Sequence, residues 1–255
     1  MESSFLDILN SSNSIKNEET GEITLTIPIF NTKSDFTIFS SCILNSNCNT
    51  VITSDTFQIS SSSVSISNIT FESSVVVTNS TNVSINNCHI KNSQSSNGAL
   101  TITNSENISI SHVTITESNK IPGLYVNQNS IVTTDSLNIH DLEESLVVCH
   151  DQSYISITNS TLTNSQANGF YISGQSYVEI NSTDIINTNY PAIYVTGSEC
   201  HIRRCTVQKV KSSGINITQE STAIVEETTF SEIDGNCIFS SNSKLQTKNN
   251  KMSGM

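Results

Sequence analysis

The stretch SGQSYVEINSTDIINTNYPAIYVTGSECHIRRCTVQKV, from Ser173 to Val210, decides the fold because it contains the same apolar pattern twice. Ile180 returns as Ile202 and Ile185 returns as Val207, in both cases about 22 residues later. A period of this length is typical of proteins built from stacked structural repeats. The remaining sequence can therefore be aligned to this stretch, one repeat at a time.

The pattern extends over most of the 255 residues. Each repeat opens with a small or polar residue and a pair of apolar residues separated by one position, and two further short segments follow after polar turns. The repeats begin about 22 to 25 residues apart, at Ser74, Ala99, Gly123, Ser145, Gly169, Ala192, Gly214 and Asn236. Pro122 and Pro191 each precede a repeat, so both fall at the same corner, where a missing N–H is tolerated.

Within each segment the apolar residues alternate with polar ones, as in Phe170/Ile172 and Val178/Ile180. Alternation of this kind indicates strands, because the apolar residues of a helix recur at three and four positions. One repeat buries nothing alone, so successive coils must stack with strands about 4.8 Å apart and inward residues in columns. We therefore predict an all-β, single-stranded solenoid with three short strands in each coil.

Coils such as GINITQESTAIVEETTFSEIDG, residues 214–235, are similar to the β-helix repeats of sugar hydrolases, carbohydrate-binding proteins and certain F-box proteins. Over about residues 36–255 the sequence resembles the right-handed parallel β-helix of the pectin-lyase-like superfamily. The resemblance implies a right-handed parallel β-helix but implies no particular activity, because this scaffold supports many unrelated functions. The first 35 residues do not fit an F-box, so a ubiquitin-ligase role is not implied.

The two ends of the chain differ from the repeats. We expect residues 1–35 to form an amino-terminal cap with a short amphipathic helix, which buries Phe5, Leu6, Ile8 and Leu9, and an edge strand in EITLTIPIF. Residues 36–255 then form the parallel β-helix. The carboxyl end, KNNKMSGM, offers no comparable cap. The chain is then either cut from a longer solenoid or meets a partner there, and end-to-end self-association is one such arrangement.

The formal net charge of −12 argues against nucleic acid or an anionic membrane as a partner, because both require clustered Lys and Arg. The sequence has no signal peptide and no run of 18 apolar residues, so we expect a cytoplasmic protein. Asn-x-Ser/Thr sequons leave secretion as the alternative, although a chain rich in these residues produces such triplets by chance. The seven cysteines form no CxxC pair, which favours reduced thiols.

The residues that usually support catalysis are scattered. Asp184 is expected to point outward without a second carboxylate beside it, and no pectinase-like motif is present. Cys149, His150 and Asp151 are adjacent, but neighbours on an extended turn point in different directions and rarely form a nucleophilic triad. The histidines fall at different positions of different coils, so we expect no metal site and no cofactor. This chemistry favours a protein that is not an enzyme, without deciding the question.

One basic segment and its acidic neighbour face each other across coils. The repeat alignment places Arg203 and Arg204 beside Glu226 and Glu227 of the next coil, one strand spacing away. Exposed ion pairs of this kind stabilise a protein by only about 0 to 1 kcal/mol. An anion-binding site at the two arginines is the alternative interpretation.

The most informative surface position lies between the two apolar residues that open each repeat. Across coils it is occupied by Val76, Thr101, Tyr125, Val147, Tyr171, Tyr194, Asn216 and Ile238, whereas the matching position of the second strand is mostly polar. An exposed aromatic patch of a few hundred Å² is typical of binding surfaces. We predict a binding site at Tyr125, Val147, Tyr171 and Tyr194 for a protein or a neutral carbohydrate. The alternative is that sheet surfaces simply favour Tyr and Val.

These observations favour a non-catalytic β-helix binding or scaffold module that recognises a protein, or a neutral glycan, through an exposed Tyr/Val face. A carbohydrate-active enzyme of the same fold, similar to polysaccharide lyases or hydrolases, is the first alternative. A structural or adhesin-like solenoid that associates through its carboxyl end is the second.

Overall fold

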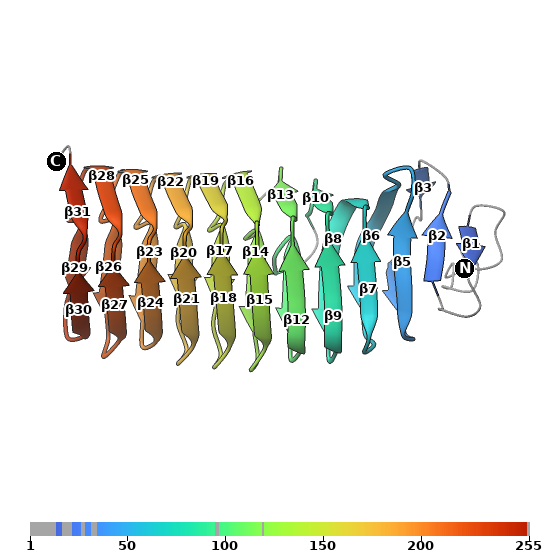
Figure 1. Ribbon diagram of the computed structural model, residues 1–255, viewed down its shortest axis with the longest axis horizontal. Coiled ribbons are helices and arrows are strands. Elements are labelled where there is room, and N and C mark those ends of the chain that lie inside the picture. The colour runs from blue at the N-terminus through green and yellow to red at the C-terminus, as the bar shows by residue number, and fades with distance from the viewer. Residues whose placement is uncertain are drawn as a thin grey trace.

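The computed structural model describes residues 14–16, 22–26, 29–31, 35–94, 97–118 and 120–253. In this part of the chain all regular secondary structure is β, and the 31 strands wind into one elongated solenoid (Figure 1). Successive coils lie side by side, with the amino-terminal strands at one end and the carboxyl-terminal strands at the other. The predicted all-β solenoid with three short strands in each coil is thus confirmed for the repeats.

Three parallel walls enclose the interior. We call them the first, second and third wall, in the order in which the chain passes through them in each coil. The first wall contains β4 (Phe36–Ile38), β11 (Leu100–Thr103), β14 (Leu124–Asn127), β17 (Val147–Cys149), β20 (Phe170–Ile172), β23 (Ile193–Thr196), β26 (Ile215–Thr218) and β29 (Ile238–Ser240). The second wall contains β2 (Glu22–Leu25), β5 (Cys42–Ser46), β7 (Val64–Ser67), β9 (Thr81–Asn86), β12 (Glu106–Ser111), β15 (Ile131–Asp135), β18 (Tyr154–Thr158), β21 (Tyr177–Asn181), β24 (Glu199–Arg203), β27 (Thr222–Glu226) and β30 (Lys244–Lys248).

The third wall contains β3 (Ile29–Asn31), β10 (His89–Lys91), β13 (Thr114–Thr116), β16 (Asn138–Leu142), β19 (Thr161–Ser165), β22 (Asp184–Thr188), β25 (Thr206–Val210), β28 (Thr229–Ile233) and β31 (Lys251–Ser253). Two long strands, β6 (Val51–Ile59) and β8 (Thr70–Thr78), pass from the third wall into the first. The corner between these two walls is therefore a continuous strand in the early coils and a loop in the later ones.

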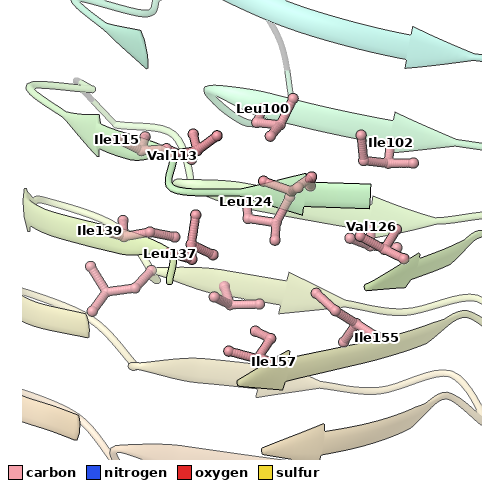
Figure 2. Packing of buried hydrophobic residues seen from close by; sticks show 14 of the residues in the cluster. Leu100, Ile102, Val113, Ile115, Leu124, Val126, Leu137, Ile139, Ile155 and Ile157 are labelled. Carbon is pink, nitrogen blue, oxygen red and sulfur yellow. The ribbon is translucent and has the colours of Figure 1, made fainter. Parts of the chain in front are cut away.

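The core consists of columns of inward side chains, because parallel strands pair in register from coil to coil. One buried column contains Ile102, Val126, Cys149, Ile172, Val195 and Ile217. Figure 2 shows Leu124, Ile139 and Ile155, from three different walls, packing toward the same interior. Phe170 and Ile193 are fully buried, as the alternation predicts. Burial of a side chain of this size contributes about 1.5–3 kcal/mol relative to exposure.

The corners explain why a protein with so much Asn and Ser folds. Asn79 and Asn104 have φ angles of 49° and 46°, in the left-handed region that Asn tolerates better than most residues. The side chain of Asn104 donates from Nδ2 to Oδ1 of Asn79 in the preceding coil, at 2.6 Å. Corner residues thus form hydrogen-bonded ladders between coils, and the polar composition supports the fold.

A second ladder is buried at the turn between the first and second walls. The backbone N–H of Ser130 donates to Oγ of Ser153 at 3.2 Å, and the N–H of Ser153 donates to Oγ of Ser176 at the same distance. These serines are almost completely buried. Because a buried N–H without an acceptor costs about 1–3 kcal/mol, each hydroxyl satisfies a backbone donor that the turn would otherwise leave unpaired.

The two ends differ in how the sheets terminate. β1 (Ser14–Lys16) pairs antiparallel with β2, whereas β2 and β3 already pair parallel with β5 and β6, so parallel stacking begins before residue 36. The helix expected at residues 5–9 and Pro28 lie outside the described residues, and the division into cap and solenoid stays a prediction. At the other end, Leu245 and Met252 are 36% and 52% exposed. No helix in the described part is long and apolar enough to cross a membrane.

Candidate functional site

The tyrosine positions predicted from the alternation lie on the outer surface of the first wall. Strand pairing places Tyr125, Val148, Tyr171 and Tyr194 beside one another in four successive coils, on β14, β17, β20 and β23. We call these four residues the tyrosine face. The ladder continues to Thr101 in one direction and to Asn216 in the other. The repeat therefore brings three of the four predicted residues together.

The predicted place of Val147 on this face is wrong, because its side chain is fully buried. Val147 pairs with Leu124 and Phe170 in the core, and Val148 pairs with Tyr125 and Tyr171. The run Leu146–Cys149 is apolar throughout, so no polar residue shows which side chains face inward. Leu146 lies at the corner, where its N–H donates to Asn168, and the strand alternation starts one residue later than expected.

The same shift occurs in the last coil, where Ile238 was expected to point outward. Ile238 pairs with the buried Ile215 and packs against the core, whereas Phe239 pairs with Asn216 and is 41% exposed. Here too three apolar residues stand in a row, from Cys237 to Phe239. Phe239 thus takes the outward position that the sequence assigned to its neighbour.

Tyr171 and Tyr194 form a stacked pair on the tyrosine face. Their ring centroids are 5.6 Å apart and the ring planes differ by 24°. The hydroxyl of Thr218 donates to the Tyr194 hydroxyl at 3.4 Å, and Tyr171 is 37% exposed. Because the rings cover each other's faces along the solenoid axis, the pair presents ring edges and hydroxyls outward. Such a surface suits contact with a protein better than flat stacking of a sugar ring between the two tyrosines.

Tyr125 belongs to a polar series at the edge of the tyrosine face. Its hydroxyl is hydrogen-bonded to Nε2 of His150, and Nδ1 of His150 lies 3.1 Å from Oδ1 of Asp151. Burial, and after it the negative charge of Asp151, raises the pKa of Tyr125. The tyrosine is thereby held in its neutral, hydrogen-bonding form.

The adjacent Cys149 takes no part in this series. Its side chain is buried in the core, where Sγ lies 3.7 Å from the carbonyl oxygen of Ser153, and burial raises the pKa of the thiol to about 12. The expectation that adjacent residues at this turn point in different directions holds for Cys149 and His150, whereas His150 and Asp151 contact each other. A nucleophilic Cys–His–Asp arrangement is thus excluded, because the thiol is neither ionised near neutral pH nor directed toward His150.

A groove of about 520 Å³ borders the tyrosine face where the third wall connects to the first. Its floor and walls are formed by Pro122, Glu143, Glu144, Ser145, Val148, Gln166, Ala167, Asn168, Tyr171 and Tyr190. Tyr190 is 61% exposed. The groove could not be predicted from the strand period, because its residues lie mostly in connecting loops, where side chains do not follow that period. The one available signal was Tyr190 immediately before Pro191.

The second wall contains a cluster that the sequence analysis also missed. Tyr154 and Tyr177 stack at 5.6 Å, and their hydroxyls each donate to one oxygen of Glu179, both at 2.9 Å. Burial, followed by the hydrogen bond to the Glu179 carboxylate, raises the pKa of both tyrosines. A tyrosine at the start of the second strand in consecutive coils, with Glu two positions after the second, was the available signal. The groups satisfy one another, which is consistent with a stabilising ladder.

The predicted ion pairing is present for Arg203 but not for Arg204, whose Nε donates to Oδ1 of Asn181 in the preceding coil at 3.3 Å. Nε of Arg203 is 3.8 Å from Glu227 and 4.0 Å from Glu226, so cross-coil ion pairs occupy the basic segment. Asp184 lies between Thr161 and Thr206 without a second carboxylate in its row. Among the described residues no group of three or more His, Cys, Asp or Glu side chains is arranged to hold a metal ion.

Three parallel walls, in-register columns and an outward aromatic row define a parallel β-helix repeat protein with a candidate binding face. Residues 145–254 match the family model described as a right handed beta helix region. The chain is thus a right-handed parallel β-helix, as its resemblance to the pectin-lyase-like repeats implied. No curated protein matches the chain in sequence.

Solved structures share this architecture at low sequence identity. ORF18 of Geobacillus virus E2 aligns with a TM-score of 0.67 at 13% identity, over 99% of this chain and 57% of the viral protein. PfbA, a surface adhesin of Streptococcus pneumoniae, aligns with a TM-score of 0.58 at 12% identity, over 93% of this chain and 85% of the adhesin. The A-module of the mannuronan C-5 epimerase AlgE6 of Azotobacter vinelandii gives a TM-score of 0.56 at 9% identity, over 92% and 91% of the two chains. At these identities the similarity shows the fold alone.

Proposed function

We propose that this β-helix is a non-catalytic binding or scaffold module that recognises a protein through the tyrosine face. The observation that supports the proposal is the stacked, partly exposed pair of Tyr171 and Tyr194 on a rigid sheet beside a groove. Aromatic side chains that are already ordered contribute binding area at little cost in conformational entropy. A protein is favoured over a neutral glycan because the pair presents edges and hydroxyls.

The test compares two stacked tyrosine pairs of nearly equal geometry on different walls. Tyr171→Ser with Tyr194→Ser removes the pair on the tyrosine face, and Tyr154→Ser with Tyr177→Ser removes the other pair as the matched control. Proteins captured from native lysate by the wild type and by the control, but lost with the first variant, would support the proposal. Equal capture by all three, with unchanged circular dichroism, would contradict it.

A carbohydrate-active enzyme is the second candidate, favoured by the hydrogen-bonded series Tyr125–His150–Asp151. A tyrosine bonded to a histidine that contacts a carboxylate can exchange a proton with a bound substrate. Turnover of uronate polysaccharides, with or without Ca²⁺, that is lost in His150→Ala would establish this function and displace the first.

An adhesin-like solenoid is the third candidate, and a similar fold in a streptococcal adhesin makes it a reasonable one. Its proposed mode is end-to-end association through the last coil, whose Leu245 and Met252 are exposed. Concentration-dependent oligomers that disappear when the two residues are replaced by Ser would support it. A cytoplasmic location and the absence of nucleic-acid or membrane partners stay predictions from the sequence.

A further inference from the structure

We propose that the groove beside the tyrosine face binds an arginine side chain of the protein partner, between the carboxylates of Glu143 and Glu144 and the rings of Tyr171 and Tyr190. This inference rests on the proposed function and specifies the chemistry of its partner. The groove adjoins the tyrosine face directly, because Val148 and Tyr171 belong to both. A segment that crosses the tyrosine face can therefore place one side chain in the groove.

The charge of the groove is unbalanced. Glu143 and Glu144 are exposed, and within the described part of the chain neither carboxylate takes part in a hydrogen bond or an ion pair. The groove has no Lys, Arg or His in its lining. An adjoining hollow of about 430 Å³ shares Glu143 and contains Lys211, but it also contains Asp141. The two glutamates thus present uncompensated negative charge, and the protein as a whole has a net charge of −12. A cationic group is the complementary occupant.

The aromatic residues favour a guanidinium over an ammonium group. Tyr190 is 61% exposed, so its ring is accessible from the groove, and Tyr171, which is 37% exposed and stacked on Tyr194, lines the groove beside it. A guanidinium is planar, stacks on aromatic rings and donates two parallel hydrogen bonds to a carboxylate, whereas an ammonium is a compact and strongly hydrated point charge. Carboxylates and tyrosines around one groove therefore select arginine rather than lysine.

The loops that form the groove are held in place by hydrogen bonds to Ser165. Its hydroxyl lies 2.9 Å from the carbonyl oxygen of Glu144 and 3.1 Å from that of Asn168, and it accepts a hydrogen bond from the N–H of Ala167 at 2.9 Å. The side chain of Asn168 donates to the carbonyl oxygen of Pro191, next to Tyr190, at 3.0 Å. Because the walls are ordered before a ligand arrives, little entropy is lost on binding.

The experiment uses the six tyrosines of the chain, which has no tryptophan, as local probes. The full chain is labelled with 3-fluorotyrosine, and the ¹⁹F resonances are assigned by single Tyr→Phe variants. The probe is the peptide acetyl-Gly-Arg-Gly-Arg-Gly-amide, and the matched peptides contain citrulline or lysine in place of arginine. We expect the arginine peptide to shift the resonances of Tyr171 and Tyr190 in a saturable manner. Tyr154 and Tyr177, on the second wall, serve as internal controls and should not shift.

The variants test the role of the two carboxylates. Glu143→Gln with Glu144→Gln should weaken binding of the arginine peptide about fivefold to tenfold, as expected for two partly exposed ion pairs. Glu106→Gln with Glu220→Gln makes the same change in net charge on another part of the surface and should leave the affinity unchanged. The citrulline peptide should bind at least fivefold more weakly than the arginine peptide, and the difference should shrink when the salt concentration is raised from about 50 to 300 mM.

The outcomes separate this inference from the function on which it rests. Absence of a shift at Tyr171 and Tyr190, equal binding of the citrulline or lysine peptide, or an unchanged affinity in the glutamine variant would each overturn the inference. If a protein partner is lost with Tyr171→Ser and Tyr194→Ser but is retained by the glutamine variant, the proposed function stands and the arginine site does not. If both variants retain the partner, both proposals fail.

Discussion

Replacing the adjacent residues Val147 and Val148 by Thr, one at a time, tests the strand register on which the tyrosine face depends. Thr has nearly the volume of Val but replaces one methyl group with a hydroxyl. Val147 is fully buried between Leu124 and Phe170, neither of which can bond a hydroxyl. An unsatisfied buried hydroxyl costs about 1–3 kcal/mol, so Val147→Thr should reduce the free energy of unfolding by that amount.

Val148→Thr is the matched control, because Val148 lies outside the core cluster and lines the groove, with 9% of its surface exposed. We expect a loss below about 1 kcal/mol at this position. Urea unfolding followed by circular dichroism measures both changes, and hydrogen exchange of the β17 and β20 amides reports local opening, since a solenoid need not unfold as a single unit. If Val148→Thr proves as costly as Val147→Thr, or more so, the assignment of Val148 to the outer surface is wrong.

Three further predictions concern single groups. Only Cys48 is exposed among the seven cysteines, so a thiol reagent at pH 8 should modify it rapidly, whereas Cys149, whose pKa burial raises to about 12, should react only after unfolding. The two tyrosines that donate to Glu179 have pKa values raised in the folded protein. Their contribution to the free energy of unfolding should therefore be fully present below about pH 10 and be lost as the pH rises through their folded-state pKa values. Ultraviolet titration at 295 nm should show both pKa values lowered in Glu179→Gln. Ser153→Ala leaves a buried N–H without its acceptor and should cost about 1–3 kcal/mol in urea unfolding, whereas Ser109→Ala on the outer surface should cost less than about 0.5 kcal/mol.

The agreement between sequence and structure is best where each residue interacts with its equivalent one coil away. Ile180 pairs with Ile202, Arg203 with Glu226, and Asp184 stands between threonines, all as the alignment of the repeats predicts. Nearest-neighbour stacking makes this possible, because the register of one coil determines the neighbours of the next. Prediction failed where the alternation is interrupted, as in the apolar run that contains Val147.

What the sequence by itself determined is the winding: three strands in each coil, apolar columns inside, and tyrosines outside on the first wall. What only the tertiary structure decided is which valine joins those tyrosines, where Glu143 and Tyr190 lie relative to them, and that Tyr125 bonds His150. The physical reason is that side chains along a strand alternate between inside and outside with a period of two, which the sequence reveals, whereas side chains within the loops between the third and first walls follow no such alternation. Their side chains take positions set by the coils on either side, and the candidate groove is built from those loops.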